Sequence, residues 1–174
     1  SIKKCKELIE KANGPISVNF EFTEWIHTIN FETYAKEELA HFFLCNSSHV
    51  VDTVFYLLGV PKEMHCNTSG GGLLDWHPSA SVFTGNGITE RDVLFNYHAN
   101  WLSSGRWGIE ISVPGKKLIL KPLERLFIQE AGSLEQSEVD LENIDKIYKP
   151  GLYRQVESFL GNQDGLCTID EHYK

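Results

Sequence analysis

Apolar residues recur along the chain at two spacings, and each spacing predicts a different kind of element. The segment IKKCKELIEKAN (2–13) has apolar residues at helical spacing and is followed by Asn-Gly-Pro, which predicts a helix and its end. The segment ISVNFEF (16–22) alternates between apolar and polar residues, as a half-buried strand does. We expect WIHTINF (25–31) to continue this strand past a bend.

The middle of the chain is dominated by alternating segments. In RDVLFNYHANW (91–101) the odd positions from Val93 onward are apolar and the even positions are polar, apart from Leu94. RWGIEISV (106–113) repeats the pattern, and a Pro-Gly turn leads into KKLILK (116–121) and then RLFIQEA (125–131). Shorter strands are expected in KEMHCNT and SASVF, on either side of a glycine-rich loop. Consecutive strands with short turns predict a largely antiparallel sheet.

The segment LCNSSHVVDTVFYLLG (44–59) predicts an amphipathic helix that ends at Gly59. At about 100° per residue, four of its side chains fall within an arc of roughly 60°. These four are Cys45, His49, Asp52 and Tyr56. Valine, leucine and phenylalanine fill the opposite half of the helix, so the polar stripe is sharply defined.

The end of the chain predicts one more long helix. It covers 149–162, with Leu152, Val156, Phe159 and Leu160 as its buried stripe. Residues 132–147 are acidic and turn-like, residues 34–43 form a helix or a loop, and Thr168 or Asp170 is placed to cap a last short helix. The order of elements predicts one α+β domain over 1–174, an open, largely antiparallel sheet with helices packed on one face.

Composition narrows the class of protein. The chain has 16 basic and 24 acidic residues and a formal net charge of −8, which argues against a nucleic-acid-binding surface. No apolar run has transmembrane length, so we expect no membrane partner. The four cysteines form no CxxC pair, which favours reduced thiols in a cytoplasmic protein over a disulfide framework.

His49 is the first candidate for chemistry. An imidazole can donate and accept protons near neutral pH, and Asp52, one turn further on, can orient it. The alternative is that both side chains are simply solvated on the outer face of the helix. Cys45 stands four residues before His49, which also leaves open a thiol nucleophile, although no oxyanion-binding motif accompanies it.

A second polar surface is expected on the strand 91–101. His98 and Asn100 point away from its apolar side, and Arg106 and Trp107 follow closely in sequence. Neutral hydrogen-bonding groups beside an aromatic wall suit a sugar-like ligand, whereas a solvated sheet face or a subunit interface fits equally well. GNGITE (85–90) lacks the third glycine and the following helix of a dinucleotide-binding loop, so no cofactor site is expected in this chain.

Three segments together resemble one known family. NSSHVVDTVFYLLGVPKEMHC resembles a helix of the Gfo/Idh/MocA oxidoreductases that carries His-x-x-Asp, VLFNYHANWLSSGRWGIEISVPGKKLILKPLERL is similar to the strands that follow there, and YKPGLYRQVESFL resembles a late helix. They occur in the family's order and span most of 15–162. The resemblance implies the C-terminal α+β domain of an NAD(P)-dependent dehydrogenase, without its N-terminal Rossmann domain.

The resemblance also implies roles for particular residues. His49 matches the family's acid/base residue at the substrate hydroxyl, and Cys45 occupies the position where many members have an aspartate. The residues expected to bind substrate are Cys45, Asn46, His98, Asn100, Arg106 and Trp107. NAD or NADP is implied for the full-length enzyme only, and the partners expected are a sugar-like substrate, the missing Rossmann domain and further copies joined through the sheet.

Two functions remain open at this point. One is the substrate-binding and oligomerisation domain of a sugar, polyol or nucleotide-sugar dehydrogenase, inactive as an isolated fragment. The other is a non-catalytic assembly domain, of which the loss of the aspartate at Cys45 would be a sign. The start at Ser1 and the single, internal Met64 suggest a piece of a longer protein in either case.

Overall fold

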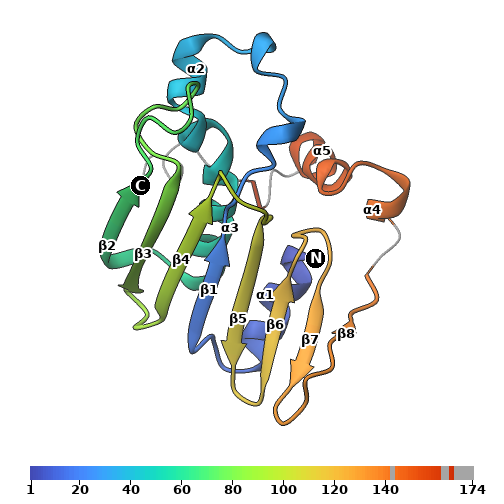
Figure 1. Ribbon diagram of the computed structural model, residues 1–174. Coiled ribbons are helices and arrows are strands. Elements are labelled where there is room, and N and C mark those ends of the chain that lie inside the picture. Colours follow the sequence, from blue (N-terminus) through green and yellow to red (C-terminus); the bar gives the residue numbers. More distant parts are fainter. Residues whose placement is uncertain (142–143, 162–164, 167–174) are drawn as a thin grey trace. The chain divides into compact units, whose positions relative to one another are not determined.

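An eight-stranded sheet forms the framework of the part of the chain that the structure describes (Figure 1). The structure is a computed structural model that describes residues 1–141, 144–161 and 165–166. The strands run in the order β2-β3-β4-β1-β5-β6-β7-β8, and all neighbours are antiparallel except the parallel pair β1 and β4. The strands are β1 (Ser17–Glu21), β2 (Pro61–Ser69), β3 (Val82–Thr89), β4 (Leu94–Asn100), β5 (Gly108–Val113), β6 (Lys116–Leu120), β7 (Phe127–Glu130) and β8 (Ser137–Glu138).

The helices belong to two compact units, Ser1–Val139 and Asp140–Lys174. The first unit holds the sheet together with α1 (Ile2–Lys11), two 3-10 helices η1 (Ile26–Thr28) and η2 (Phe31–Thr33), α2 (Lys36–Ala40), a π-helical segment η3 (Phe43–Ser47) and α3 (Ser48–Leu58). The second unit holds α4 (Ile144–Ile147) and α5 (Leu152–Leu160). The predicted α+β class and the open, mostly antiparallel sheet are confirmed.

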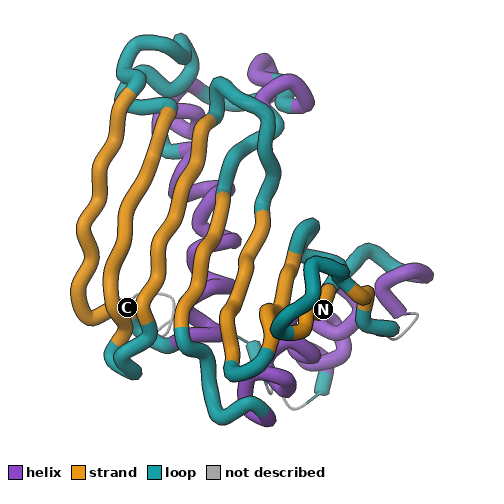
Figure 2. The backbone as a smooth tube through the Cα atoms, turned by 60° about the horizontal axis from the view of Figure 1, so that its bottom comes forward, coloured by secondary structure: helices purple, strands orange, loops and turns teal. Residues whose placement is uncertain are grey.

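The core of the first unit lies between the sheet and the helices α1 and α3, which cover one face (Figure 2). Because side chains alternate along a strand, Val18 and Phe20 of β1 both point to this side. Phe55 of α3 packs against them, with its ring edge-on to that of Phe20 and the two ring centroids 6.4 Å apart. Gly59 ends α3 with a φ of +93°, a conformation that glycine adopts without strain. Hydrophobic periodicity therefore located the main elements of this layer correctly.

Three expectations about local structure were wrong. Residues 25–31 do not continue β1, because Thr28 and Thr33 hydroxyls donate to nearby carbonyls and the Asn30 side chain accepts from the Glu32 N–H, which favours short 3-10 turns. The expected strand at 79–83 begins only at Val82.

The third expectation concerns α5. The helix forms, but the stripe predicted to be buried is exposed, with Leu152 at 48%, Val156 at 47%, Phe159 at 65% and Leu160 at 78%. The described part of the second unit consists of two short helices, which is too little apolar surface to bury the stripe within that unit. The predicted helix start at Thr168 or Asp170 lies outside the described residues.

Candidate functional site

The topology brings three chain segments together at one edge of the sheet. Because β1 and β4 are parallel and β5 is antiparallel to β1, the ends of β1 and β4 meet the beginning of β5. Residues 22–25 continue from β1, and residues 101–107 connect β4 to β5. The turn that leads into α3 joins this edge through a hydrogen bond from Ser47 to Glu24.

Glu24 is the centre of this cluster. Its side chain is only 3% exposed, and its Oε1 accepts hydrogen bonds from Ser47 Oγ at 2.7 Å and from Trp107 Nε1 at 3.0 Å. Burial raises the pKa of the Glu24 carboxyl above its ordinary value, and the hydrogen bonds from Ser47, Trp107 and Asn46 and the charge of Arg106 oppose that rise. The carboxyl therefore links the last residue of η3, just before α3, to the residue just before β5.

Arg106 lies beside two indole rings. Its guanidinium carbon is 4.8 Å from the ring centroid of Trp25 and 4.9 Å from that of Trp107, both within cation–π range. Trp25 is held in turn by a hydrogen bond of 2.6 Å from its Nε1 to the carbonyl of Gly105. The arrangement places a cation and two aromatic surfaces at the same edge of the sheet.

His49 lies in the first turn of α3 and is exposed. Its ring centroid is 6.3 Å from that of Trp107, with the two ring planes at 55°. Cys45, Asp52 and Tyr56 are exposed as well, so the polar stripe predicted for this helix is confirmed as a solvent-facing stripe. Of the residues expected to act on substrate, His49, Arg106 and Trp107 thus lie together.

Two neighbouring residues of η3, Cys45 and Asn46, differ in their contacts. The Asn46 side chain hydrogen-bonds Glu24, which makes Asn46 part of the cluster. Cys45 is exposed, and no hydrogen bond joins its thiol to His49 or to any other described residue. The geometry gives no base paired with this thiol, so a Cys-His nucleophile has no structural basis in the described residues.

His98 and Asn100 lie apart from this cluster. His98 is exposed and stands on the face of β4 opposite to the buried Ala99, and therefore on the side of the sheet away from α3. Asn100 turns back on its own loop, where its Oδ1 accepts a hydrogen bond of 3.0 Å from the Leu102 N–H. The structure does not bring these two predicted substrate-binding residues to His49.

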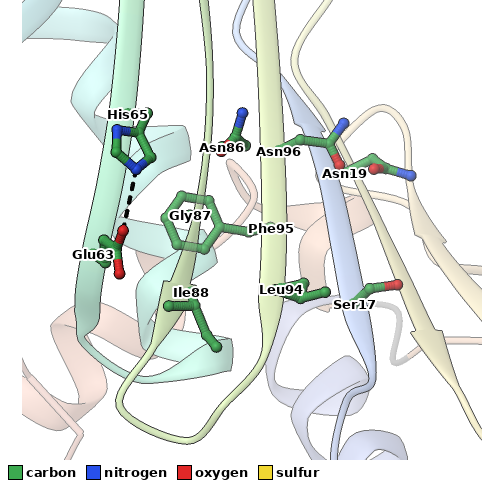
Figure 3. A pocket seen from close by; sticks show the side chains of 10 residues that line it. All are labelled: Ser17, Asn19, Glu63, His65, Asn86, Gly87, Ile88, Leu94, Phe95 and Asn96. Carbon is green, nitrogen blue, oxygen red and sulfur yellow. Dashed lines mark hydrogen bonds and ion pairs between the residues drawn. The ribbon is translucent and has the colours of Figure 1, made fainter.

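The open face of the sheet carries a second polar region. A shallow depression of about 480 Å³ crosses β2, β3, β4 and β1 there, and the amides of Asn86, Asn96 and Asn19 follow one another across three strands (Figure 3). The strand register pairs Asn19 with Asn96 and Asn96 with Asn86. At the rim, His65 Nε2 lies 3.1 Å from Glu63 Oε1.

Sequence reasoning missed the residues that organise the sheet-edge cluster. Glu24, Ser47 and Trp25 were not singled out, although Glu24 contacts Trp107 and Trp25 contacts Arg106, and Ser47 donates a hydrogen bond to Glu24. A signal for Glu24 was present, since it is a carboxylate two residues after an apolar strand segment and directly before a tryptophan. Its partners Ser47 and Trp107 are 23 and 83 positions away in sequence, so only the fold reveals the pairing.

Some kinds of site are missing from the part of the chain that the structure describes. No group of three or more His, Cys, Asp or Glu side chains there is arranged to hold a metal ion. None of the described helices has the length and apolar character to cross a membrane. GNGITE does not form a dinucleotide-binding loop, because its glycines lie inside a strand rather than at a strand-to-helix turn.

Comparison with known proteins identifies the fold of the chain. No protein-family model matches the sequence, and no curated protein is significantly similar to it. Among solved structures, the chain is similar to an inositol dehydrogenase homolog from Azotobacter vinelandii, complexed with NADH and myo-inositol, with a TM-score of 0.63 and 12% identity over 80% of this chain and 39% of that one.

Two further structures match over more of the chain. An oxidoreductase from Thermotoga maritima gives a TM-score of 0.67 and 14% identity over 94% of this chain and 49% of that one. A super-repressor mutant of Gal80p from Saccharomyces cerevisiae gives a TM-score of 0.68 and 13% identity over 98% of this chain and 51% of that one.

The chain thus spans between 39% and 51% of the length of these solved proteins. At identities of 12% to 14% the likeness is one of fold. The chain has the fold of the C-terminal half of the Gfo/Idh/MocA oxidoreductases.

Proposed function

We propose that this chain is the substrate-binding and oligomerisation domain of an NAD(P)-dependent dehydrogenase that acts on a sugar, a polyol or a nucleotide sugar. The observation that carries the proposal is the position of His49, exposed in the first turn of α3 and 6.3 Å from the indole of Trp107. A proton-transferring imidazole beside an aromatic wall is what the oxidation of a ring hydroxyl needs. The free thiols of Cys5, Cys45 and Cys66 are compatible with a cytoplasmic enzyme.

The chain's own residues handle the proton and the position of the substrate. When a hydroxyl-bearing carbon is oxidised, an unprotonated His49 ring nitrogen takes the hydroxyl proton while the C–H hydrogen leaves as hydride. The hydride needs an acceptor, and we assign that role to a nicotinamide held by a nucleotide-binding domain outside this chain, as the resemblance to the family implies. Trp107, fixed by its hydrogen bond to Glu24, supports the sugar ring next to His49.

His49→Asn tests this function in the full-length gene product. Asparagine keeps a polar side chain of similar reach and cannot act as a base near neutral pH, so we expect turnover to fall by about 10²- to 10⁴-fold. Nucleotide affinity and thermal stability should stay unchanged. His41→Asn is the matched control, because His41 is also exposed but lies outside α3, seven residues before its start.

The nucleotide-binding step has its own test. Chain 1–174 alone should show no saturable binding of NADH. Saturable binding to this chain would contradict the assignment of the cofactor to another domain. Unchanged turnover of His49→Asn would instead remove His49 from the reaction.

A non-catalytic assembly domain is the second candidate. Cys45 occupies the position at which the family that the sequence resembles often has an aspartate, and its thiol has no partner among the described residues. The fold match to the Gal80p repressor, over 98% of this chain, favours it as well. A full-length product that binds no nucleotide and oxidises no sugar, yet assembles, would favour this candidate.

A further inference from the structure

The guanidinium of Arg106 has N–H donors that no described residue uses. The residue is half-buried, and its side chain makes no hydrogen bond or ion pair with any other described residue. It lies against the rings of Trp25 and Trp107 and interacts electrostatically with the neighbouring Glu24. The carboxyl of Glu24 is already engaged by Ser47 and Trp107.

An arginine held in this way is preorganised for a bidentate anion. The five N–H donors of a guanidinium lie in its plane, and their fork matches the two oxygens of a carboxylate or a phosphate. Ring contacts of the cation–π type leave these donors unused while they restrict the side chain. Trp25 is itself held by Gly105, so the wall beside Arg106 is fixed.

A cavity of about 320 Å³ lies at the same edge of the sheet. Glu24 and Trp25, which both lie beside Arg106, line this cavity. Its wall also includes His27 and the hydroxyl residues Ser103 and Ser104. The volume is at the lower end of the range for small-molecule sites. Hydroxyls and an imidazole are suitable partners for the oxygens of a small polar ligand.

The overall charge makes a local cation necessary for any anionic ligand. The chain carries a net charge of −8, so its general field repels anions. Binding of an anionic sugar would therefore depend on Arg106 directly, and surface lysines elsewhere would contribute little at physiological salt. This dependence makes the inference testable with one substitution.

We infer that the substrate is an acidic sugar, whose carboxylate or phosphate group binds Arg106 while the hydroxyl to be oxidised lies against His49. This inference rests on the proposed function and narrows its substrate class. The shared chemistry is a planar or tetrahedral oxyanion on a sugar ring. Neutral polyols lack that group and bind less tightly.

The test is calorimetric titration of chain 1–174 at constant ionic strength, with tryptophan fluorescence as a second readout. The ligands are glucuronate, glucose 6-phosphate, glucose and inorganic phosphate. Charge-assisted hydrogen bonds of this type correspond to about a tenfold to hundredfold difference in Kd, so at least one acidic sugar should bind that much more tightly than glucose. Preference for glucuronate identifies a carboxylate ligand, and preference for glucose 6-phosphate identifies a phosphate ligand.

Two variants complete the test. Arg106→Gln should abolish the preference, so that the acidic sugar and glucose bind with equal affinity. Arg91→Gln removes the same charge from an exposed turn between β3 and β4, at the opposite edge of the sheet, and should change nothing. Circular dichroism of both variants confirms that they are folded.

Three results would overturn the inference. Equal affinity for glucose and both acidic sugars would do so and would leave the role of His49 standing. Inorganic phosphate binding as tightly as glucose 6-phosphate would reduce Arg106 to a general anion site. If none of the sugars binds the chain, the inference also fails, whereas the His49→Asn experiment on the full-length product still decides the proposed function separately.

Discussion

The molecule has two polar regions, and they are built in different ways. At the sheet edge, Glu24, Ser47 and Trp107 are tied by hydrogen bonds between residues up to 83 positions apart. On the open face, Asn19 and Asn96 are aligned by the register of neighbouring strands. Their amide groups are exposed and make no hydrogen bond to another described residue.

The difference separates an organised site from a polar surface. A buried carboxylate is costly unless its hydrogen bonds are made, so Glu24 constrains the surrounding side chains. Exposed asparagines on a strand cost little in any orientation and constrain nothing. We therefore expect ligand chemistry at the edge and association of subunits, as proposed, on the open face.

The largest effect is expected from the aromatic core beneath the edge. Trp101 is fully buried, its ring stacks on Trp76 at 5.5 Å, and its Nε1 donates to the carbonyl of Phe22. Trp101→Ala should lower the free energy of unfolding by about 3–5 kcal/mol in urea denaturation. The neighbouring Leu102 is 46% exposed, and Leu102→Ala should cost less than about 0.5 kcal/mol. Equal losses in the two variants would show that the edge does not rest on this core.

A smaller effect, with a defined pH dependence, is expected from Glu24. Burial raises its pKa from the ordinary value of 4.5, so the folded protein holds this proton more tightly than the unfolded chain does. The stability that Glu24 contributes is therefore fully present below pH 4.5 and is lost as the pH rises through the raised pKa. Glu24→Gln removes this titration, and its unfolding free energy should gain on the wild type as the pH increases across that window.

Two controls sharpen this prediction. Glu24→Ala leaves the donors of Ser47 and Trp107 unpaired and should cost about 1–3 kcal/mol at neutral pH. Glu90 is exposed, so Glu90→Gln should leave the pH dependence of stability as it is in the wild type. A Glu24→Gln protein that follows the wild-type pH profile would contradict the assignment of the raised pKa to burial.

The smallest effect on stability is expected on the open face. Asn96 is exposed, so Asn96→Ala should change the unfolding free energy by less than about 0.5 kcal/mol. If copies associate through this face, Asn96→Lys should prevent the association, because it would bury an unpaired charge. Sedimentation velocity measures this, and an Asn96→Lys protein that assembles like the wild type would move the interface elsewhere.

The sequence predicted the framework better than it predicted the site. Alternation in 91–101 and 106–113 located β4 and β5, and the helical stripe around His49 was correct, because periodicity reports which face is buried. Periodicity reports nothing about which edge residues meet. Hence His98 and Asn100 were grouped with Arg106 from their closeness in sequence, while the structure separates His98 from it and brings in Glu24 from the segment after β1 instead.

In the second unit the helix was predicted correctly, but the burial of its apolar stripe was not. The pattern of α5 was read correctly as a helix, yet its apolar stripe is exposed in the structure. An apolar stripe on a helix predicts a packing partner for that face, but it does not identify the partner. The strand prediction for 25–31 was wrong for a different reason. Hydrogen bonds between side chains and the local backbone outweighed a weak strand pattern there.

The central claim is that ligands bind at the sheet edge and not on the open face. The four tryptophans, Trp25, Trp76, Trp101 and Trp107, make it testable by titrating ¹⁵N-labelled chain 1–174 with glucuronate and with glucose while following indole and backbone N–H resonances. The account predicts saturable shifts of the Trp25 and Trp107 indoles, with the backbone amides of Asn86 and Asn96 unmoved. Saturable shifts at Asn86 and Asn96, with Trp25 and Trp107 unmoved, would contradict it.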